Sequence, residues 1–197
     1  MKVLTVREMV LCGLFIALIT AGTLIRIPVG TDVYTLQFLF TLMAGMVLGA
    51  RLGAWTVGVY VAMGLVGIPV FASGGGPAYL LQPTFGYLLG FILQAWFCGW
   101  YARKLEKPGF LSLLGGNVGG MAIVYVIGIT WFYVVSNHIL GTEISAWTAI
   151  LYCGILQAPP DFLLCMAAAG LSLRFLHAGL WLEHGAAEVH SKEVEEV

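Results

Sequence analysis

Long stretches without a charged residue constrain this chain more than any other feature of its sequence. No Asp, Glu, Lys or Arg occurs between Arg51 and Arg103, and other uncharged runs cover 9–25, 33–50 and 108–142. The sequence is 60% hydrophobic and 10% charged, whereas soluble domains carry roughly 25% charged residues. Because a membrane-spanning helix needs roughly 20 mostly apolar residues, these runs predict an all-α integral membrane protein.

The spacing of the charges predicts six transmembrane helices. We place them near 8–27, 33–50, 53–70, 84–103, 111–136 and 160–178. The segment 145–157 is also apolar, but it ends at Pro159-Pro160, and proline disrupts a helix interior. We interpret it as a short interfacial helix, with a seventh span as the alternative. A single domain, 1–178, is then followed by a short acidic tail, 179–197, with five acids and one lysine.

The basic residues predict an orientation. If both termini are cytoplasmic, only Arg26 lies on the outer side. The other bases then lie inside: Lys2, Arg7, Arg51, Arg103, Lys104, Lys107, Arg174 and Lys192. This asymmetry is typical of membrane proteins, whose cytoplasmic loops are enriched in Lys and Arg. The first loop, 28–34, and the glycine-rich segment 71–83 are then expected on the outer face.

The segment 71–83 is uncharged and contains Gly74-Gly75-Gly76. Non-helical backbone near a bilayer is tolerated only where it is buried in protein or lines a cavity. One interpretation is a lid over an apolar ligand, and the other is a plain extracellular turn.

Motifs for catalysis or nucleotide hydrolysis are absent from the sequence. It contains no G-x-x-x-x-G-K-[ST], no H-E-x-x-H and no G-x-S-x-G. The four cysteines are widely spaced without C-x-x-C, which favours packing over a zinc site or a disulfide framework. We therefore expect no enzyme, metal site or cofactor, and the net charge of −1 gives no reason to expect a nucleic-acid partner.

Three motifs occur in a characteristic order: YTLQ at 34–37, GLVGIPVFASGGG at 64–76 and QPTFGYLLGF at 82–91. Together they resemble the BioY family, the biotin-specific substrate-binding subunits (S components) of energy-coupling factor (ECF) transporters, over nearly all of 5–175. The resemblance implies six helices with both termini inside and a biotin pocket near the outer face, covered by the first and third loops. It also implies a transmembrane coupling protein and two ATPase subunits as partners, in a prokaryotic plasma membrane.

Two positions take a specific expectation from this resemblance. Ala17 and Ala21 are small residues four apart, which let another helix approach closely. Internal packing would explain them, but the resemblance implies docking of the coupling protein. Asp161 follows two prolines, where the N-terminal dipole of the last helix favours an acid. It is either a helix-start residue or, as the resemblance implies, the acceptor for biotin's ureido N–H groups.

One departure from the family pattern leaves the identity of the ligand undecided. BioY proteins commonly carry a lysine three residues after this aspartate, where the chain has Leu164. A subunit for another small vitamin or precursor is therefore the second hypothesis, and a membrane enzyme or assembly factor is the third.

The remaining ligand-site candidates are a base and a set of aromatic, glycine and polar residues. Arg26 has three interpretations: it pairs with Asp32, binds the ligand's carboxylate, or reaches the lipid headgroups. A vitamin pocket needs apolar walls with a few fixed polar groups. The candidates for these are Phe71, Gly75, Gly76, Tyr79, Gln82, Thr84, Tyr87, Tyr125 and Trp131.

Overall fold

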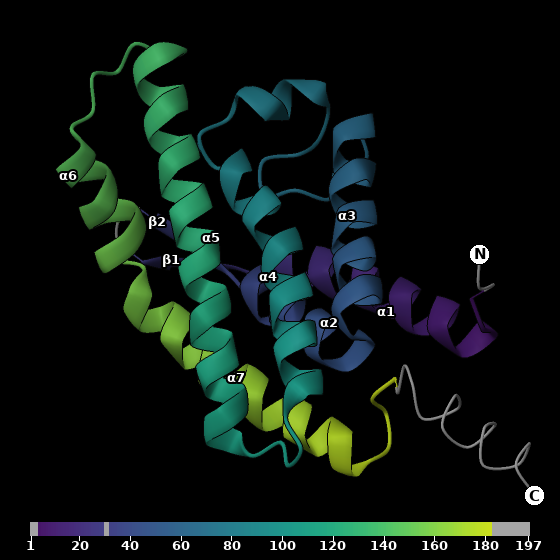
Figure 1. The fold of residues 1–197 in the computed structure, drawn as a ribbon. Helices are drawn as coiled ribbons and strands as arrows, with labels where there is room; N and C mark the ends of the chain where they lie inside the picture. The colour runs from purple at the N-terminus through teal and green to yellow at the C-terminus, as the bar shows by residue number, and fades with distance from the viewer. Residues whose placement is uncertain (1–3, 30–31, 183–197) are drawn as a thin grey trace, which may run out of the picture.

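Six long helices form the bundle shown in Figure 1, a computed structural model that describes residues 4–29 and 32–182. They are α1 (Val6–Leu24), α2 (Gln37–Leu48), α3 (Ala50–Val66), α4 (Phe85–Lys104), α5 (Phe110–His138) and α7 (Ala158–His177). Within the described part of the chain, α1, α5 and the helical run Ala146–His177 are long and apolar enough to cross a membrane. The predicted all-α class with six main helices is confirmed.

The first connection is more ordered than the predicted loop 28–34. It forms an antiparallel hairpin of β1 (Arg26–Val29) and β2 (Asp32–Thr35), in which Arg26 pairs with Thr35. Both strands are rich in β-branched residues, which favour extended backbone. The hairpin uses residues that we had assigned to the flanking helices, so α1 ends earlier and α2 begins later than predicted.

The helix α2 is short because other helices surround it. It contacts α1, α3, α4 and α7, and every residue of it except Phe40 is buried. Gly49 separates it from α3 and has a φ of 86°, in the range that favours glycine. Because of the sharp turn at this residue, α2 ends two residues earlier and α3 begins three residues earlier than predicted. A helix enclosed by protein need not match the full thickness of a bilayer.

The last helical region is nearly continuous. The helix α6 (Ala146–Ile150) leads into a π-helical turn, Leu151–Ile155, and α7 begins at Ala158. We predicted that Pro159-Pro160 would stop the segment 145–157. They instead occupy the first turn of α7, where a missing N–H costs little. Asp161 therefore lies in the first turn of α7, as predicted.

The loop between α3 and α4, residues 67–84, covers one end of the bundle, at the top of Figure 1. The helix α3 stops four residues before its predicted end because Gly67 has a φ of 115° and Pro69 follows. Within the loop, Pro77–Leu81 form a 3-10 turn. The loop backbone is tied back to α3, since Gly76 N donates to Gly64 O at 2.7 Å.

Arg103 closes the opposite end of the bundle. Its guanidinium donates to Met46 O at 2.7 Å, to Val47 O at 3.1 Å and to Leu182 O at 3.0 Å. It also lies over the buried Trp181 ring, 4.6 Å from the centroid. The chain after α7 is thereby fastened to the ends of α2 and α4.

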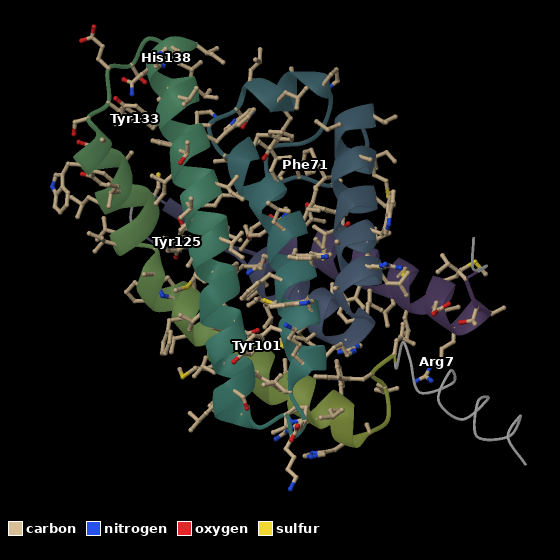
Figure 2. The ribbon with its side chains drawn as sticks, in the orientation of Figure 1. Arg7, Phe71, Tyr101, Tyr125, Tyr133 and His138 are labelled. Atoms are coloured by element: carbon tan, nitrogen blue, oxygen red, sulfur yellow. The ribbon has the colours of Figure 1, made fainter. Side chains whose placement is uncertain are left out.

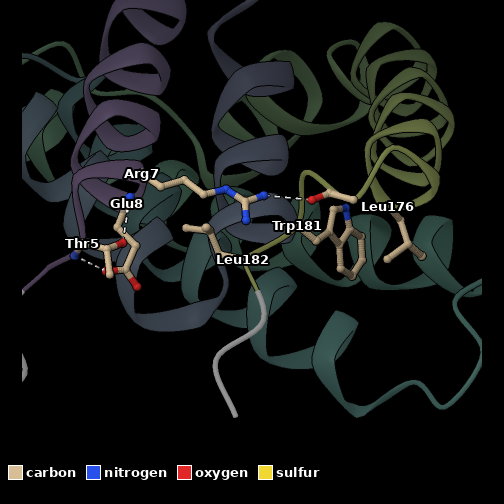
Figure 3. A pocket seen from close by; sticks show the side chains of 7 residues that line it. Thr5, Arg7, Glu8, Leu176, Trp181 and Leu182 are labelled. Atoms are coloured by element: carbon tan, nitrogen blue, oxygen red, sulfur yellow. Dashed lines mark hydrogen bonds between the residues drawn. The ribbon is translucent and has the colours of Figure 1, made fainter. Parts of the chain in front are cut away.

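A hollow of about 610 Å³ lies between this chain segment and the start of α1. In Figure 3, Arg7 crosses it and donates to the carbonyl of Gly179, at 2.8 Å. The predicted tail, 179–197, thus begins with packed residues, since Trp181 and Leu182 are buried; its part after residue 182 lies outside the described residues.

Candidate ligand-binding site

A cavity of about 530 Å³ lies under loop 67–84, at the end of the bundle opposite Arg103. The start of α2, the loop itself, α4, α5 and the turn before α7 all contribute to its wall. The lining residues are Thr35, Gln37, Ala72, Ser73, Tyr79, Gln82, Thr84, Tyr87, Leu88, Phe91, Phe132, Tyr152, Cys153 and Gln157. None of these described lining residues is charged, so the wall combines aromatic surface with amides and hydroxyls.

Asp161 lies in a smaller hollow, of about 50 Å³, that adjoins this cavity. The two share Thr35, Tyr87, Phe91 and Gln157. The carboxylate is 5% exposed and accepts a hydrogen bond from Tyr125 Oη at 2.8 Å. An ionised carboxylate can accept about four hydrogen bonds. The Tyr125 contact leaves acceptor capacity for a ligand.

Tyr125 was expected to contact the ligand directly, but in the structure it contacts Asp161 instead. It lies on α5, on the side that meets α6 and α7, as Figure 2 shows. It is absent from the lining of both hollows in the described structure and reaches the site through Asp161. Asp161 was expected as a helix-start residue or a ligand acceptor, and the structure adds this hydrogen bond from the Tyr125 hydroxyl.

Four candidates that lie within or between the sequence motifs at 64–91 come together in the cavity wall. Tyr79, Gln82 and Thr84 approach from loop 67–84, and Tyr87 from the first turn of α4. The hydroxyl of Tyr87 donates to Cys153 O at 3.0 Å, which ties α4 to the π-helical turn. A ligand contact at each of them stays a prediction.

Phe71 and Trp131 do not line the cavity but support the loop that covers it. Phe71, labelled in Figure 2, is 1% exposed. Its ring centroid lies 4.5 Å from that of Tyr79 and 5.7 Å from that of Tyr60. Trp131 Nε1 donates to Gln82 O at 3.2 Å. The buried side chain of Phe71 therefore anchors the loop from within, and Trp131 holds it from α5.

The candidates Gly75 and Gly76 likewise act through backbone. A side chain at Gly75 would meet the carbonyl oxygens of Ile68 and Gly64. The close approach fixes the path of the loop, while Ala72 and Ser73 supply its cavity-facing surface.

A model of the BioY family matches residues 1–179. This chain belongs to the BioY family. A probable biotin transporter BioY from Lysinibacillus sphaericus is 38% identical over 168 residues, which cover 85% of each protein. A biotin transporter BioY from Thermotoga maritima is 42% identical over 124 residues, 62% of this chain and 72% of the relative.

A solved structure shares the fold. It is described as the S-component for biotin from an ECF-type ABC transporter, and it superposes with a TM-score of 0.78 at 24% identity. The match covers 89% of this chain and 95% of the other. The bundle described above is therefore the S-component fold of the BioY family.

Several polar wall residues of this BioY-family cavity were missed from the sequence, among them Thr35, Gln37 and Gln157. Thr35 and Gln37 belong to the motif YTLQ, so the motif itself was the available signal. Gln157 lies in the segment that we interpreted as interfacial, and its apolar pattern gave no sign that one polar residue turns inward.

Arg26 is placed only by its backbone, because its side chain lies outside the described residues. Its partner across the hairpin is Thr35, which lines both hollows. Paired residues of an antiparallel hairpin lie roughly 5 Å apart. The backbone of Arg26 is therefore beside the cavity wall, and which of its three partners it meets stays open.

Ala17 and Ala21 lie away from the site, exposed on α1. Gly13, one turn earlier, is also exposed, and a side chain added there would meet nothing within 4 Å. The buried residues of α1 are Phe15, Ile19, Gly22 and Thr23. Gly13, Ala17 and Ala21 thus form a small-residue face directed out of the bundle, and packing inside the bundle does not explain it.

Proposed function

We propose that this BioY-family chain is the biotin-capturing subunit of an ECF-type uptake transporter rather than an enzyme. One observation carries the proposal: a buried carboxylate, Asp161, ends a cavity whose other described lining residues are uncharged. Curated relatives named as biotin transporters support the choice of ligand.

The chemistry of the cavity suits biotin. The ureido N–H groups are donors, and Asp161 is the strong acceptor at the deep end. The apolar bicycle and tail fit against the aromatic wall formed by Tyr79, Tyr87 and Phe91. The amides of Gln82 and Gln157 and the hydroxyl of Thr84 then supply orientation. Leu164, in place of the lysine expected by resemblance, packs against the core, so Asp161 has no base at that position.

The orientation that follows is a multi-pass protein of the prokaryotic plasma membrane with both termini in the cytoplasm. The bases Arg51, Arg103 and Lys104 line one groove at the end of the bundle opposite the cavity. Arg7 and Arg174 lie near the same end, at the start of α1 and the last turn of α7. A cytoplasmic location of this end satisfies the preference for positive charge inside and places the cavity outside.

The partners proposed from the family are a transmembrane coupling protein and two ATPase subunits. The small-residue face Gly13, Ala17 and Ala21 is where we place the coupling protein. Small side chains allow close backbone approach between helices in lipid, where hydrophobic attraction between helices is weak.

Identification of a copurified small molecule tests this function. We expect mass spectrometry of the protein, purified from cells supplied with biotin, to find about one biotin per chain. Another small vitamin or precursor would preserve the capture role and replace the ligand, as the Leu164 departure suggests. Protein without a bound molecule, and without biotin binding in calorimetry, would contradict the proposal and favour the enzyme or assembly-factor hypothesis.

A further inference from the structure

The hydroxyl of Tyr60 joins three separate parts of the molecule. Tyr60 lies on α3 and is fully buried. Its Oη lies 2.8 Å from Val70 O in loop 67–84, 3.0 Å from Thr23 Oγ1 on α1, and 3.1 Å from Gln37 Nε2 at the start of α2. Gln37 also lines the ligand cavity. One oxygen therefore links the loop over the cavity, a cavity wall residue and the helix with the small-residue face.

The Tyr60 hydroxyl can donate its proton to either of two acceptors. Gln37 Nε2 can only donate. Thr23 Oγ1 lies 2.8 Å from Ile19 O, to which it donates its single proton. With that proton on Ile19 O, Thr23 Oγ1 meets Tyr60 Oη as an acceptor. The single proton of Tyr60 has two acceptors within reach, Val70 O and Thr23 Oγ1, and it can serve one at a time.

The two acceptors lie in different kinds of structure, one in a helix and the other in a loop. Thr23 is fixed in a helix, whereas Val70 lies near the start of loop 67–84, directly before Phe71. Ala72 and Ser73 follow and form part of the cavity roof. A buried donor that loses its acceptor weakens the state that contains it by about tenfold or more. Displacement of the loop would leave the buried Tyr60 hydroxyl without an acceptor unless it donated to Thr23 Oγ1 instead.

We propose that Tyr60 is a positioning residue that sets the rate of ligand release, by donating to Val70 while loop 67–84 covers the cavity and to Thr23 when the loop is displaced. The inference rests on the proposed function, since it requires a ligand beneath the loop. Tyr60 acts through Val70 and Gln37 and does not itself line the cavity.

Two substitutions separate this role from ordinary packing, because they act in opposite directions. Tyr60→Phe leaves the buried Val70 carbonyl without this donor in the covered state, whereas in the displaced state Thr23 Oγ1 still keeps its bond to Ile19 O, so biotin should dissociate severalfold faster. Thr23→Val keeps the shape but removes the alternative acceptor, so the displaced state is penalised and biotin should dissociate about tenfold more slowly. The double variant should behave like Tyr60→Phe alone, because Thr23 acts only through that hydroxyl.

A matched control lies one turn earlier on the same helix. Thr20 Oγ1 donates to Ile16 O at 2.8 Å, the same backbone contact that Thr23 makes, and no contact with Tyr60 accompanies it. Thr20→Val should leave the dissociation rate unchanged. If Tyr60→Phe cannot be purified in folded form, Thr23→Val against Thr20→Val decides the question.

The experiment measures release of labelled biotin from each purified variant after addition of excess unlabelled biotin, with equilibrium binding measured in parallel. Slower release from Thr23→Val and faster release from Tyr60→Phe support the proposal. Faster or unchanged release from Thr23→Val, with biotin still bound by wild type, overturns this inference alone. Wild-type protein that binds no biotin would overturn the proposed function together with it.

Discussion

The two ends of the helix bundle each contain a hollow, but their polar groups are used differently. At the end near α1's start, Arg7 donates to Gly179 O and Glu8 accepts from Thr5 N, so the polar groups that line the hollow pair within the chain. At the other end, Asp161 is buried and has one described partner, Tyr125. We therefore place the ligand at the Asp161 end, where a buried carboxylate keeps acceptor capacity, although the hollow at the other end is larger.

The same contrast separates stability from binding. Arg103 uses its charge on three backbone carbonyls and Trp181, which hold α2, α4 and the final segment together. The groups around the ligand cavity also tie elements together, as Tyr87 does with Cys153 and Tyr125 with Asp161, but by single hydrogen bonds from separate side chains. We therefore expect substitutions at the Arg103 end to affect unfolding, and those at the Asp161 end to affect the ligand.

The largest expected effect is on docking of the coupling protein, at the small-residue face of α1 between the two ends of the bundle. Ala17→Trp with Ala21→Trp should abolish recovery of the coupling protein in a pull-down, because two indoles prevent close approach to α1. Biotin binding should be unchanged, since neither residue lines the cavity. Val126→Trp, at an exposed position on α5, is the control and should leave recovery intact. Full recovery with the double variant would remove the docking claim.

Asp161→Asn should give the next largest effect. A hydrogen bond to a charged group contributes about 1.5–3 kcal/mol, so biotin affinity should fall about tenfold to a hundredfold. Asn replaces half of the acceptor with a donor facing the ligand's own N–H, so Asp161→Ala should cost nearly the same. Calorimetry on the purified variants measures it.

Tyr125→Phe sharpens that experiment. It removes the hydroxyl that donates to Asp161 at 2.8 Å but keeps the carboxylate and the ring. Affinity should fall by less than in Asp161→Asn. Wild-type affinity in both Asp161 variants would reduce Asp161 to a helix-start residue and move the site to Gln82, Thr84 and Tyr87.

Arg103→Gln should lower stability by about 2–3 kcal/mol, because it removes charged hydrogen bonds to three carbonyls. For a chain of this size the thermal midpoint should fall by about 5–10 °C. The adjacent Lys104→Gln removes only a cation–π contact with Trp100, in which Nζ lies 4.1 Å from the ring centroid. That variant should change the midpoint by no more than about 2–4 °C, and equal midpoints for both would contradict the assignment.

Arg26→Ala should have the smallest effect on binding. It distinguishes among the three partners considered for the Arg26 side chain. If Arg26 meets the ligand's carboxylate, the variant should lose most of the preference for biotin over an uncharged biotin ester, a change of severalfold in relative affinity. Competition binding with both compounds measures it. An unchanged preference would assign Arg26 to Asp32 or to the lipid headgroups.

The sequence predicted the bundle well because helix number depends on apolar length, which is local. It did not predict the hairpin 26–35 or the shortness of α2, because these depend on pairing and enclosure by other segments. In the candidate site, Asp161 was expected from the family resemblance and its place after two prolines, and Gln82, Thr84 and Tyr87 from the motif QPTFGYLLGF. Gln157 and the Tyr125–Asp161 bond were not, since both depend on how α5 meets the start of α7.

The central claim is that the ligand binds at the Asp161 end while the Arg103 end holds the fold, and one paired measurement tests it. Biotin calorimetry and thermal unfolding are run on wild type, Asp161→Asn and Arg103→Gln under the same conditions. The account predicts that Asp161→Asn loses affinity and keeps its midpoint, and that folded Arg103→Gln keeps affinity and loses several degrees. Lost affinity in folded Arg103→Gln, with wild-type affinity in Asp161→Asn, would contradict it.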